Sequence, residues 1–235
     1  MKTFAEKLFD DLFAEKPVVN YEFSSENLGR RDRKIAECLL EYGIKEKKCL
    51  DVGPGTGRWL QFLKNHEADY IGAIDVSEES LKRCSSICDK TQKANVETDK
   101  FDFESDFFDI VISFEVLEHL RNPDNYLSEI LRIAKTGAIV IISVPNLVSL
   151  ISRLRVLFGF LPAAVAADET HVRFYRQKDI TRLLNTYELR PVFIPTSISL
   201  NPLKPKSRFP LPSIKLLSSL DDSLLFVIRN DMKHH

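Results

Sequence analysis

The chain has 235 residues, 44% of them hydrophobic, and this length and composition predict one globular domain with a buried core and room for a small lid. The formal net charge of −1 provides no global positive field to gather nucleic acid, so a nucleic-acid substrate is disfavoured. No apolar stretch is long enough to span a bilayer. The first residues are acidic and amphipathic, unlike a secretory signal, and we expect a cytoplasmic protein.

The chain begins with two predicted helices. Apolar residues at helical spacing indicate one helix over 3–15, ended by Pro17, and another over 31–42, ended by Gly43. From residue 48 onward, short apolar runs alternate with amphipathic segments. This alternation predicts an α/β fold in which a parallel sheet carries helices on both faces. The predicted strands are 48–52, 70–75, 95–98, 108–113, 138–144 and an edge strand at 224–228, and the helices are 57–66, 77–88, 123–135, 147–158 and 177–187.

A turn with three glycines follows the first predicted strand. Gly53, Gly55 and Gly57 stand in the run Asp51-Val-Gly-Pro-Gly-Thr-Gly, directly before a helix. A side chain at any of these glycines would block a ligand lying against the backbone or force an unfavourable φ. The second strand ends in Asp75, where nucleotide-binding sheets hold a ribose diol. The pattern therefore predicts an adenosine-containing ligand, with Val76 either on the adenine face or in the core.

The spacing of the glycines separates two classes of ligand. A dinucleotide fold requires G-x-G-x-x-G, whereas this chain has G-x-G-x-G. The segment resembles class I S-adenosylmethionine-dependent methyltransferases over roughly residues 45–190. The resemblance implies a doubly wound, Rossmann-like and mostly parallel sheet of seven strands, the last antiparallel, with S-adenosylmethionine as cofactor and S-adenosylhomocysteine as product. It assigns cofactor contacts in the first motif to Asp51, Gly53, Pro54, Gly55 and Gly57.

The same resemblance assigns further cofactor contacts. Asp99 follows the third predicted strand and stands nine residues before Phe108-Asp109. At this distance before the fourth strand, relatives place an acid that binds the adenine edge, so the resemblance assigns that role to Asp99. Asp102 is a rival for that role. Lys100 and Phe101 next to Asp99 are included in the predicted site, and Ser113 and Phe114 at the end of the fourth strand are expected near the methionine part of the donor. Asp51, Asp75, Asp99, Ser113 and Asn146 all fall at or just past predicted strand ends, where open α/β sheets bind ligands.

Two histidines are candidates for a general base, since their free pKa is about 6.5. His119 lies in the run Glu115-Val-Leu-Glu-His, and His171 in the run His-Val-Arg-Phe-Tyr. Each histidine is alternatively a structural residue that bonds a neighbouring loop. Arg173 is a candidate for holding an anionic acceptor, with Tyr175 and Asn146 as further acceptor contacts. The alternative for the second run is a hydrogen-bonded hinge that orders a lid.

The segment after the fifth strand departs from the plain fold. Residues 147–160 form an apolar helix with two arginines, which either packs on the core or provides a greasy acceptor pocket or a membrane-facing patch. We divide the chain into an N-terminal helical cap (1–44), a cofactor-binding core (45–146), a lid insertion (147–176) and a C-terminal completion of the sheet (177–235).

No metal site is expected. Cys84 and Cys88 lie four residues apart on a predicted helix, but no partner histidine or cysteine pair lies near them, which favours free cytosolic thiols here and at Cys38 and Cys49. The terminal His234-His235 has the form of a tag remnant and is not counted as a metal site.

The Ser143-Val-Pro-Asn146 ending resembles a subgroup that modifies quinones, sugars and lipids. It implies methyl transfer from S-adenosylmethionine to an oxygen of a small-molecule, lipid or sugar acceptor that is partly apolar or anionic, with peripheral membrane contact as a further expectation. The alternatives are a catalytically silent S-adenosylmethionine-binding scaffold and an NAD(P)-binding oxidoreductase. The sequence does not indicate an oligomeric state.

Overall fold

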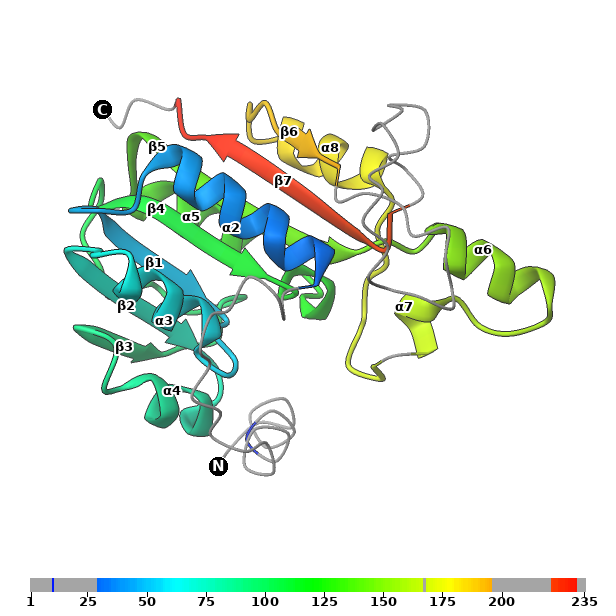
Figure 1. Cartoon of the computed structure of the whole chain (residues 1–235), viewed down its shortest axis with the longest axis horizontal. Helices are drawn as coiled ribbons and strands as arrows, with labels where there is room; N and C mark the ends of the chain where they lie inside the picture. Colours follow the sequence, from blue (N-terminus) through cyan, green and yellow to red (C-terminus); the bar gives the residue numbers. More distant parts are fainter. Residues whose placement is uncertain (1–9, 11–28, 167, 196–220, 232–235) are drawn as a thin grey trace.

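The computed structural model describes residues 10, 29–166, 168–195 and 221–231. Within these residues the chain forms one seven-stranded sheet with the order β3-β2-β1-β4-β5-β7-β6 (Figure 1). Strands β1 to β5 are parallel, and β7 is antiparallel to both β5 and β6. The predicted doubly wound, mostly parallel sheet is confirmed. The strands are β1 (Lys48–Val52), β2 (Tyr70–Asp75), β3 (Lys90–Lys93), β4 (Phe108–Phe114), β5 (Ala134–Pro145), β6 (Val192–Ile194) and β7 (Ser223–Arg229).

Helices cover both faces of the sheet and create two hydrophobic cores. One face carries α2 (Arg30–Tyr42), α3 (Arg58–Asn65) and α4 (Glu78–Cys84), and the other carries α5 (Asp124–Ile133) and α8 (Gln177–Asn185) (Figure 1). Along β1, Cys49 packs into the first core while Leu50 and Val52 pack into the second. A central strand covered on both sides must be apolar at every position that points to a helix, which explains its continuous apolar run.

The register brings the carboxyl ends of the central strands to one edge. Asp51 of β1 is level with Ala73 of β2 and with Ile112 of β4, and Ser113 is level with Ile142 of β5. The residues that follow these strands therefore lie close together, as the site prediction required.

The third strand lies at 90–93, and its prediction at 95–98 was wrong. The β-branched residues Val96 and Thr98 suggested a strand, but the chain turns there, because the N–H groups of Thr98 and Asp99 donate to Asn95 O at 3.0 and 2.8 Å. The true edge strand Lys-Thr-Gln-Lys is polar and pairs only with β2, so it carries no apolar signal. The three-residue β6 was also not predicted, and because it pairs with β7, the run 224–228 is not the edge strand that was expected but lies between β5 and β6.

Several helices are shorter than their patterns suggested. The predicted helix 77–88 ends at Cys84, the one at 123–135 ends at Ile133, and the one at 147–158 begins at Leu150 with Ser149 as its N-cap. The predicted helix over 3–15 lies outside the described residues, apart from Asp10.

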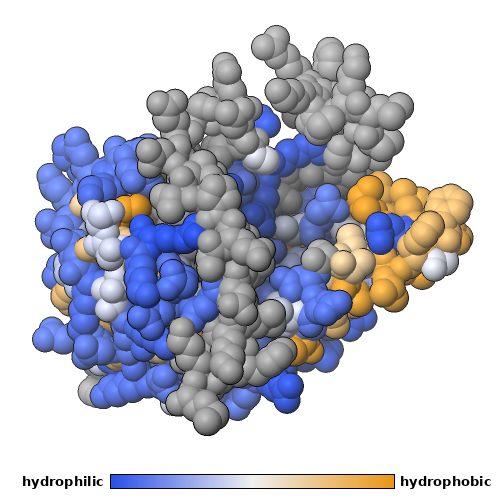
Figure 2. Space-filling view, turned by 90° about the horizontal axis from the view of Figure 1, so that it is seen from below, coloured by the Kyte–Doolittle hydropathy of each residue, from blue (hydrophilic) through white to orange (hydrophobic). Residues whose placement is uncertain are grey.

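The segment between β5 and α8 projects from the sheet. It contains α6 (Leu150–Leu157) and α7 (Ala163–Ala166), which extend beyond the end of β5 (Figure 1). The core-packing alternative for α6 is wrong, since Ser152 is the only buried residue of this helix. Figure 2 shows a projecting hydrophobic surface here, formed by α6 and the loop after it, which we call the apolar prong (residues 150–161). Within the prong, Leu157 is 76% and Phe158 72% exposed. Among the described residues, no helix has the length and hydropathy needed to cross a bilayer.

Candidate functional site

The turn after β1 has the backbone conformation that glycine favours. Gly53 and Gly57 both have φ +78°, in the left-handed region that side-chain-bearing residues rarely adopt. A Cβ at Gly53 would lie 2.4 Å from Cγ2 of Val116, and one at Gly57 would lie 2.9 Å from Sγ of Cys84. The turn thus brings bare backbone to the strand-end edge, against which a ligand can pack.

Asp51 supplies a buried carboxyl group beside this turn. Its side chain is 2% exposed, and its Oδ2 has no hydrogen-bond partner. Burial raises the pKa of the Asp51 carboxyl well above its usual range, the neighbouring Asp75 raises it further, and Arg58 opposes the shift. An orphaned buried carboxylate oxygen is unfavourable unless a donor reaches it. The α-ammonium of a methionine moiety fits that requirement.

Asp75 is held rigidly at the end of β2. The N–H of Ser77 donates to Oδ1 at 2.9 Å, and the Ser80 hydroxyl donates to Oδ2 at 2.8 Å. Burial raises the pKa of Asp75, whereas these hydrogen bonds lower it. Val76 is half-buried and joins neither hydrophobic core, which favours the adenine-face role over the core alternative. A fixed carboxylate of this kind fits a ribose diol.

The predicted adenine-edge residue Asp99 lies in the loop after β3. Asp99 is exposed and accepts hydrogen bonds from Asn95 N at 2.8 Å and Thr98 Oγ1 at 3.0 Å, so its role on the adenine edge stays a prediction. Asn95 follows β3 more closely than Asp99 does, and it was not considered because that strand was predicted five residues too late.

Lys100 and Phe101 do not reach the glycine turn. Phe101 is 1% exposed within a hydrophobic core, and its carbonyl accepts from Arg132 near the end of α5. Lys100 and Asp102 line a hollow of about 580 Å³ with Tyr70, at the amino ends of the strands. The structure therefore does not support Lys100 or Phe101 as cofactor contacts, nor Asp102 as the rival acid, because the loop folds back along the sheet.

Three other predicted contacts are engaged within the protein, two through hydrogen bonds and one through ring packing. The Ser113 hydroxyl donates to Val52 O at 2.9 Å and ties β4 to β1, and Phe114 packs on Trp59 with ring centroids 5.3 Å apart. Asn146 is 1% exposed, and its Nδ2 donates to Asp221 O at 2.7 Å. Asn146 thus orders the turn before α6, and the structure does not support it as an acceptor contact.

The run at 171–175 is hydrogen-bonded to the segment that follows β4. The N–H groups of Val172 and Arg173 both donate to Glu118 O at 3.0 Å, and the Arg173 guanidinium donates to Arg121 O. Tyr175 is 6% exposed and belongs to a hydrophobic core, while Arg173 is exposed. The hinge alternative fits better than a shared acceptor-binding face. A contact between Arg173 and an anionic acceptor stays a prediction.

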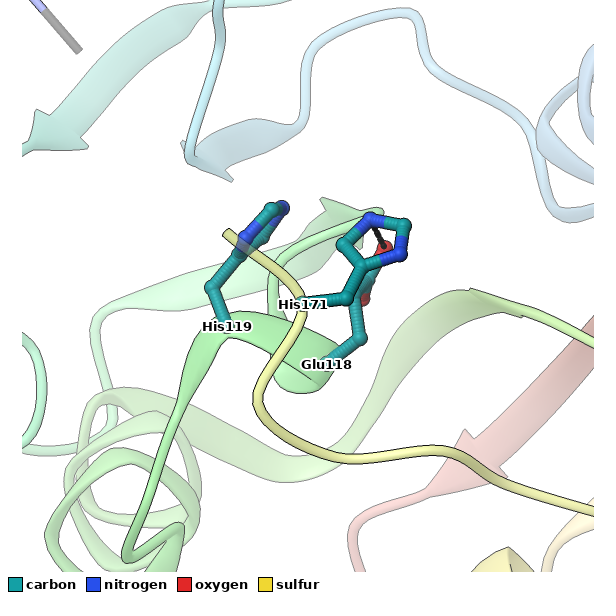
Figure 3. A group of neighbouring side chains, drawn as sticks. All are labelled: Glu118, His119 and His171. Atoms are coloured by element: carbon teal, nitrogen blue, oxygen red, sulfur yellow. Dashed lines mark ion pairs between the residues drawn. The ribbon is translucent and has the colours of Figure 1, made fainter. Parts of the chain in front are cut away.

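The two candidate bases meet at the end of β4. The rings of His119 and His171 lie 4.9 Å apart, and both neighbour Glu118 (Figure 3). Burial and the nearby His171 lower the pKa of His119, which leaves a neutral imidazole at pH 7. Burial, with Glu115 as a smaller contribution, raises the pKa of Glu118 to about 9. The sequence analysis did not single out Glu118, although it lies beside His119.

An α/β sheet with a glycine turn at one strand end, an orphaned buried acid and a fixed acid at the next strand end defines a nucleotide-binding site of the methyltransferase type. The chain belongs to the methyltransferase family, because the family model described as "Methyltransferase domain" matches residues 25–192. It is thus a methyltransferase, and its membership of this family makes S-adenosylmethionine its cofactor. This membership sets aside the oxidoreductase alternative.

Individual relatives are distant. The chain is 30% identical over 110 residues to a ubiquinone biosynthesis O-methyltransferase of Acinetobacter baylyi, which covers 44% of this chain and 46% of that protein. It therefore spans about half the length of this relative.

Solved structures share the fold at low identity. The protein bound to the Trm112 methyltransferase activator of Haloferax volcanii has a TM-score of 0.67 at 18% identity, covering 98% of this chain and 99% of that one. A SAM-dependent methyltransferase of Archaeoglobus fulgidus has a TM-score of 0.61 at 18% identity, covering 97% and 100% of the two chains.

Proposed function

We propose that this protein transfers a methyl group from S-adenosylmethionine to a hydroxyl oxygen of a small-molecule, lipid or sugar acceptor. The observation that carries the proposal is the pair of imidazoles at the end of β4, on the same edge of the sheet as Asp51 and Asp75. The name of the Acinetobacter relative, an O-methyltransferase, supports an oxygen acceptor.

The cofactor, when bound, supplies an electrophilic methyl group on a sulfonium. The protein's contribution is to bind and orient this cofactor. Asp75 would receive the ribose diol and Asp51 the ammonium group, and the cofactor would lie against the bare backbone of the glycine turn. The imidazole of His119 or His171 accepts the proton of an acceptor hydroxyl. Most of the rate enhancement comes from alignment in a site that excludes water.

The acceptor is proposed to be at least partly apolar. The segment 147–166 is dominated by apolar residues, contains Arg153 and Arg155, and has no acidic residue. Its exposed apolar side chains lie on α6 and the following loop, beyond the end of β5 (Figure 2). If this segment acts as a lid, its apolar side chains would line one side of the acceptor pocket, and its arginines would favour an anionic group on the acceptor.

The same prong supports peripheral contact with a membrane. Two arginines beside exposed Leu157, Phe158 and Phe160 match a surface of acyl chains and anionic headgroups. The four free cysteines support a reducing compartment, and we place the protein in the cytoplasm.

A calorimetric titration with S-adenosylhomocysteine tests the cofactor site, with NAD as the comparison ligand. We expect binding of the first and none of the second. Asp75→Ala should abolish binding while Asp69→Ala, an exposed acid just before the amino end of the same strand, leaves it unchanged. Thermal melting checks that both variants fold. Retained affinity in Asp75→Ala contradicts the ribose assignment.

A screen of hydroxylated acceptors then separates the enzyme from the silent scaffold. Formation of S-adenosylhomocysteine that depends on an added phenol, lipid or sugar supports methyl transfer to oxygen. Tight binding of S-adenosylhomocysteine with no turnover on any of these acceptor classes would favour the scaffold.

A further inference from the structure

Glu118 carries a buried carboxylate whose two oxygens have no hydrogen-bond partner. The residue is 1% exposed, and neither Oε1 nor Oε2 is satisfied. Its backbone is well fixed, since its carbonyl accepts from the N–H groups of Val172 and Arg173. A buried carboxylate without a partner is unfavourable, which points to a missing cationic or donor ligand.

Two imidazoles border this carboxylate (Figure 3). His171 Nε2 lies 3.9 Å from Glu118 Oε1, and one nitrogen or oxygen atom from each of Glu118, His119 and His171 lies within 4.8 Å of the other two. Glu118 and His119 belong to the short 3-10 helix Leu117–His119, whereas His171 follows α7. The cluster thus joins two segments that are about fifty residues apart in the chain.

The hydrogen bonds of both rings orient their nitrogens. His171 Nδ1 lies 2.8 Å from Ala164 O, a pure acceptor, so Nδ1 carries the proton and Nε2 keeps its lone pair on the side of Glu118. The Thr170 hydroxyl donates to Asp168 Oδ1 at 2.6 Å and therefore accepts from His119 Nδ1 at 2.8 Å. His119 Nε2 is then also the lone-pair nitrogen. Such outer hydrogen bonds are what fix the tautomer of metal-binding histidines.

We propose that Glu118, His119 and His171 bind one divalent transition-metal ion. Two imidazole nitrogens with one carboxylate favour Zn²⁺, Mn²⁺, Fe²⁺ or Co²⁺ over Mg²⁺ and Ca²⁺, which prefer all-oxygen sites. Ligand atoms on one tetrahedral zinc ion lie roughly 3.3 Å apart, given bond lengths of about 2.0–2.2 Å. The three observed atoms lie within 4.8 Å of one another, so an ion would have to draw them closer together. Three protein ligands leave one position for water or another oxygen, as in catalytic sites.

The ion would also clamp the segment before α8 to the end of β4. Glu118 O already holds Val172 and Arg173, and a shared ion would add a side-chain link between the same two segments. No metal was expected from the sequence, because the three ligands are divided between distant segments and only folding unites them. This inference goes beyond methyl transfer and does not depend on it, and in the ion-bound form the two imidazoles would bind the metal instead of acting as general bases.

The test is metal binding by the full-length chain without cofactor. The background variant carries His234→Ala and His235→Ala, since these terminal imidazoles would bind metal themselves. After treatment with a chelator and buffer exchange, calorimetry with Zn²⁺, Mn²⁺ and Mg²⁺ should show one Zn²⁺ ion per chain, weaker Mn²⁺ and no Mg²⁺ binding. Thermal melting should show a rise in Tm with Zn²⁺.

Three variants locate the site, and one controls for it. Glu118→Gln keeps the side-chain volume and removes the charge, so it should fold, bind Zn²⁺ at least about tenfold more weakly and lose the Zn²⁺-induced rise in Tm. His119→Ala and His171→Ala should weaken binding similarly. His66→Ala, which removes an imidazole at the C-cap of α3, should change nothing. Equal Zn²⁺ affinity in Glu118→Gln and the background, or no Zn²⁺ binding in the background, would overturn the proposal.

Discussion

The Ser80 hydroxyl of α4 lies 2.8 Å from Oδ2 of Asp75 and 3.0 Å from the carbonyl oxygen of Gly55. One buried serine thus connects the acid at the end of β2 with the glycine turn after β1. The hydroxyl has a single proton, and the carboxylate is the stronger acceptor, so Ser80 mainly fixes the rotamer of Asp75. The geometry of the cofactor site therefore depends on a residue that has no direct role in the chemistry.

Replacing Ser80 should weaken cofactor binding without unfolding the protein. Hydrogen bonds to charged groups contribute about 1.5–3 kcal/mol, so Ser80→Ala should raise the Kd for S-adenosylhomocysteine by roughly tenfold or more. Ser85→Ala is the matched control, because its hydroxyl bonds Lys82 O at the exposed end of the same helix. Calorimetry measures both. Equal affinities in the two variants would contradict the positioning role of Ser80.

A comparison of alanine substitutions at Gly53 and Gly43 separates the cost of backbone strain from the cost of a steric conflict. Both have positive φ, +78° and +76°, but a Cβ meets Val116 at 2.4 Å only at Gly53, whereas nothing lies within 4 Å of one at Gly43. Gly43→Ala should lower the free energy of unfolding by about 1–3 kcal/mol. Gly53→Ala should lower it by a further 1–3 kcal/mol or so, the usual range for overpacking, and reduce cofactor affinity.

A second substitution identifies the steric contribution. Because the conflict at Gly53 is with a methyl group of Val116, Val116→Ala should restore part of the stability lost in Gly53→Ala, measured by urea unfolding of the double variant. The same substitution combined with Gly43→Ala should give simple additivity. Additivity in both pairs would show that strain alone accounts for the loss.

The apolar prong should bind anionic membranes. Burying large apolar side chains contributes about 1.5–3 kcal/mol each when complete, so Leu157→Ser, Phe158→Ser and Phe160→Ser together should lower sedimentation with phosphatidylglycerol vesicles by more than about tenfold. Leu40→Ser removes a 51% exposed leucine of α2 and should have no effect. Neutral phosphatidylcholine vesicles should bind less, because Arg153 and Arg155 lose their anionic partners.

Self-association of the chain is the alternative role for the apolar prong. Exposed apolar surface also suits contact with a second copy of the chain, which light scattering at increasing protein concentration detects. Dimerisation that the serine substitutions abolish, without any vesicle binding, would contradict the membrane proposal.

The two candidate bases should differ in their effect on turnover. Once an acceptor is known, loss of a general base should lower kcat by about 10²–10⁴-fold with little change in the Kd for S-adenosylhomocysteine. We expect that loss in His119→Ala or in His171→Ala. A decrease below tenfold in both variants would leave the imidazoles with positioning roles alone.

The sequence determined the elements whose signals are local. The glycine spacing, Asp51 and Asp75 follow from a strand, a turn and a strand end that are read within a single segment, and all three are where the sequence predicted them. Central strands were found because burial on both faces leaves a continuous apolar run.

Tertiary structure decided what depends on contacts between distant segments. The edge strand β3 is polar because half of it faces water, and only its pairing with β2 reveals it. Three residues near strand ends in the sequence lie elsewhere in the fold. Lys100 lines a hollow at the amino ends of the strands, Phe101 lies in a hydrophobic core, and Asn146 is hydrogen-bonded in the turn before α6. The cluster of Glu118, His119 and His171 likewise exists only when residues 117–119 meet the segment after α7. Local patterns fix secondary structure and backbone turns, whereas burial, hydrogen-bond partners and shared ligands arise when the chain closes on itself.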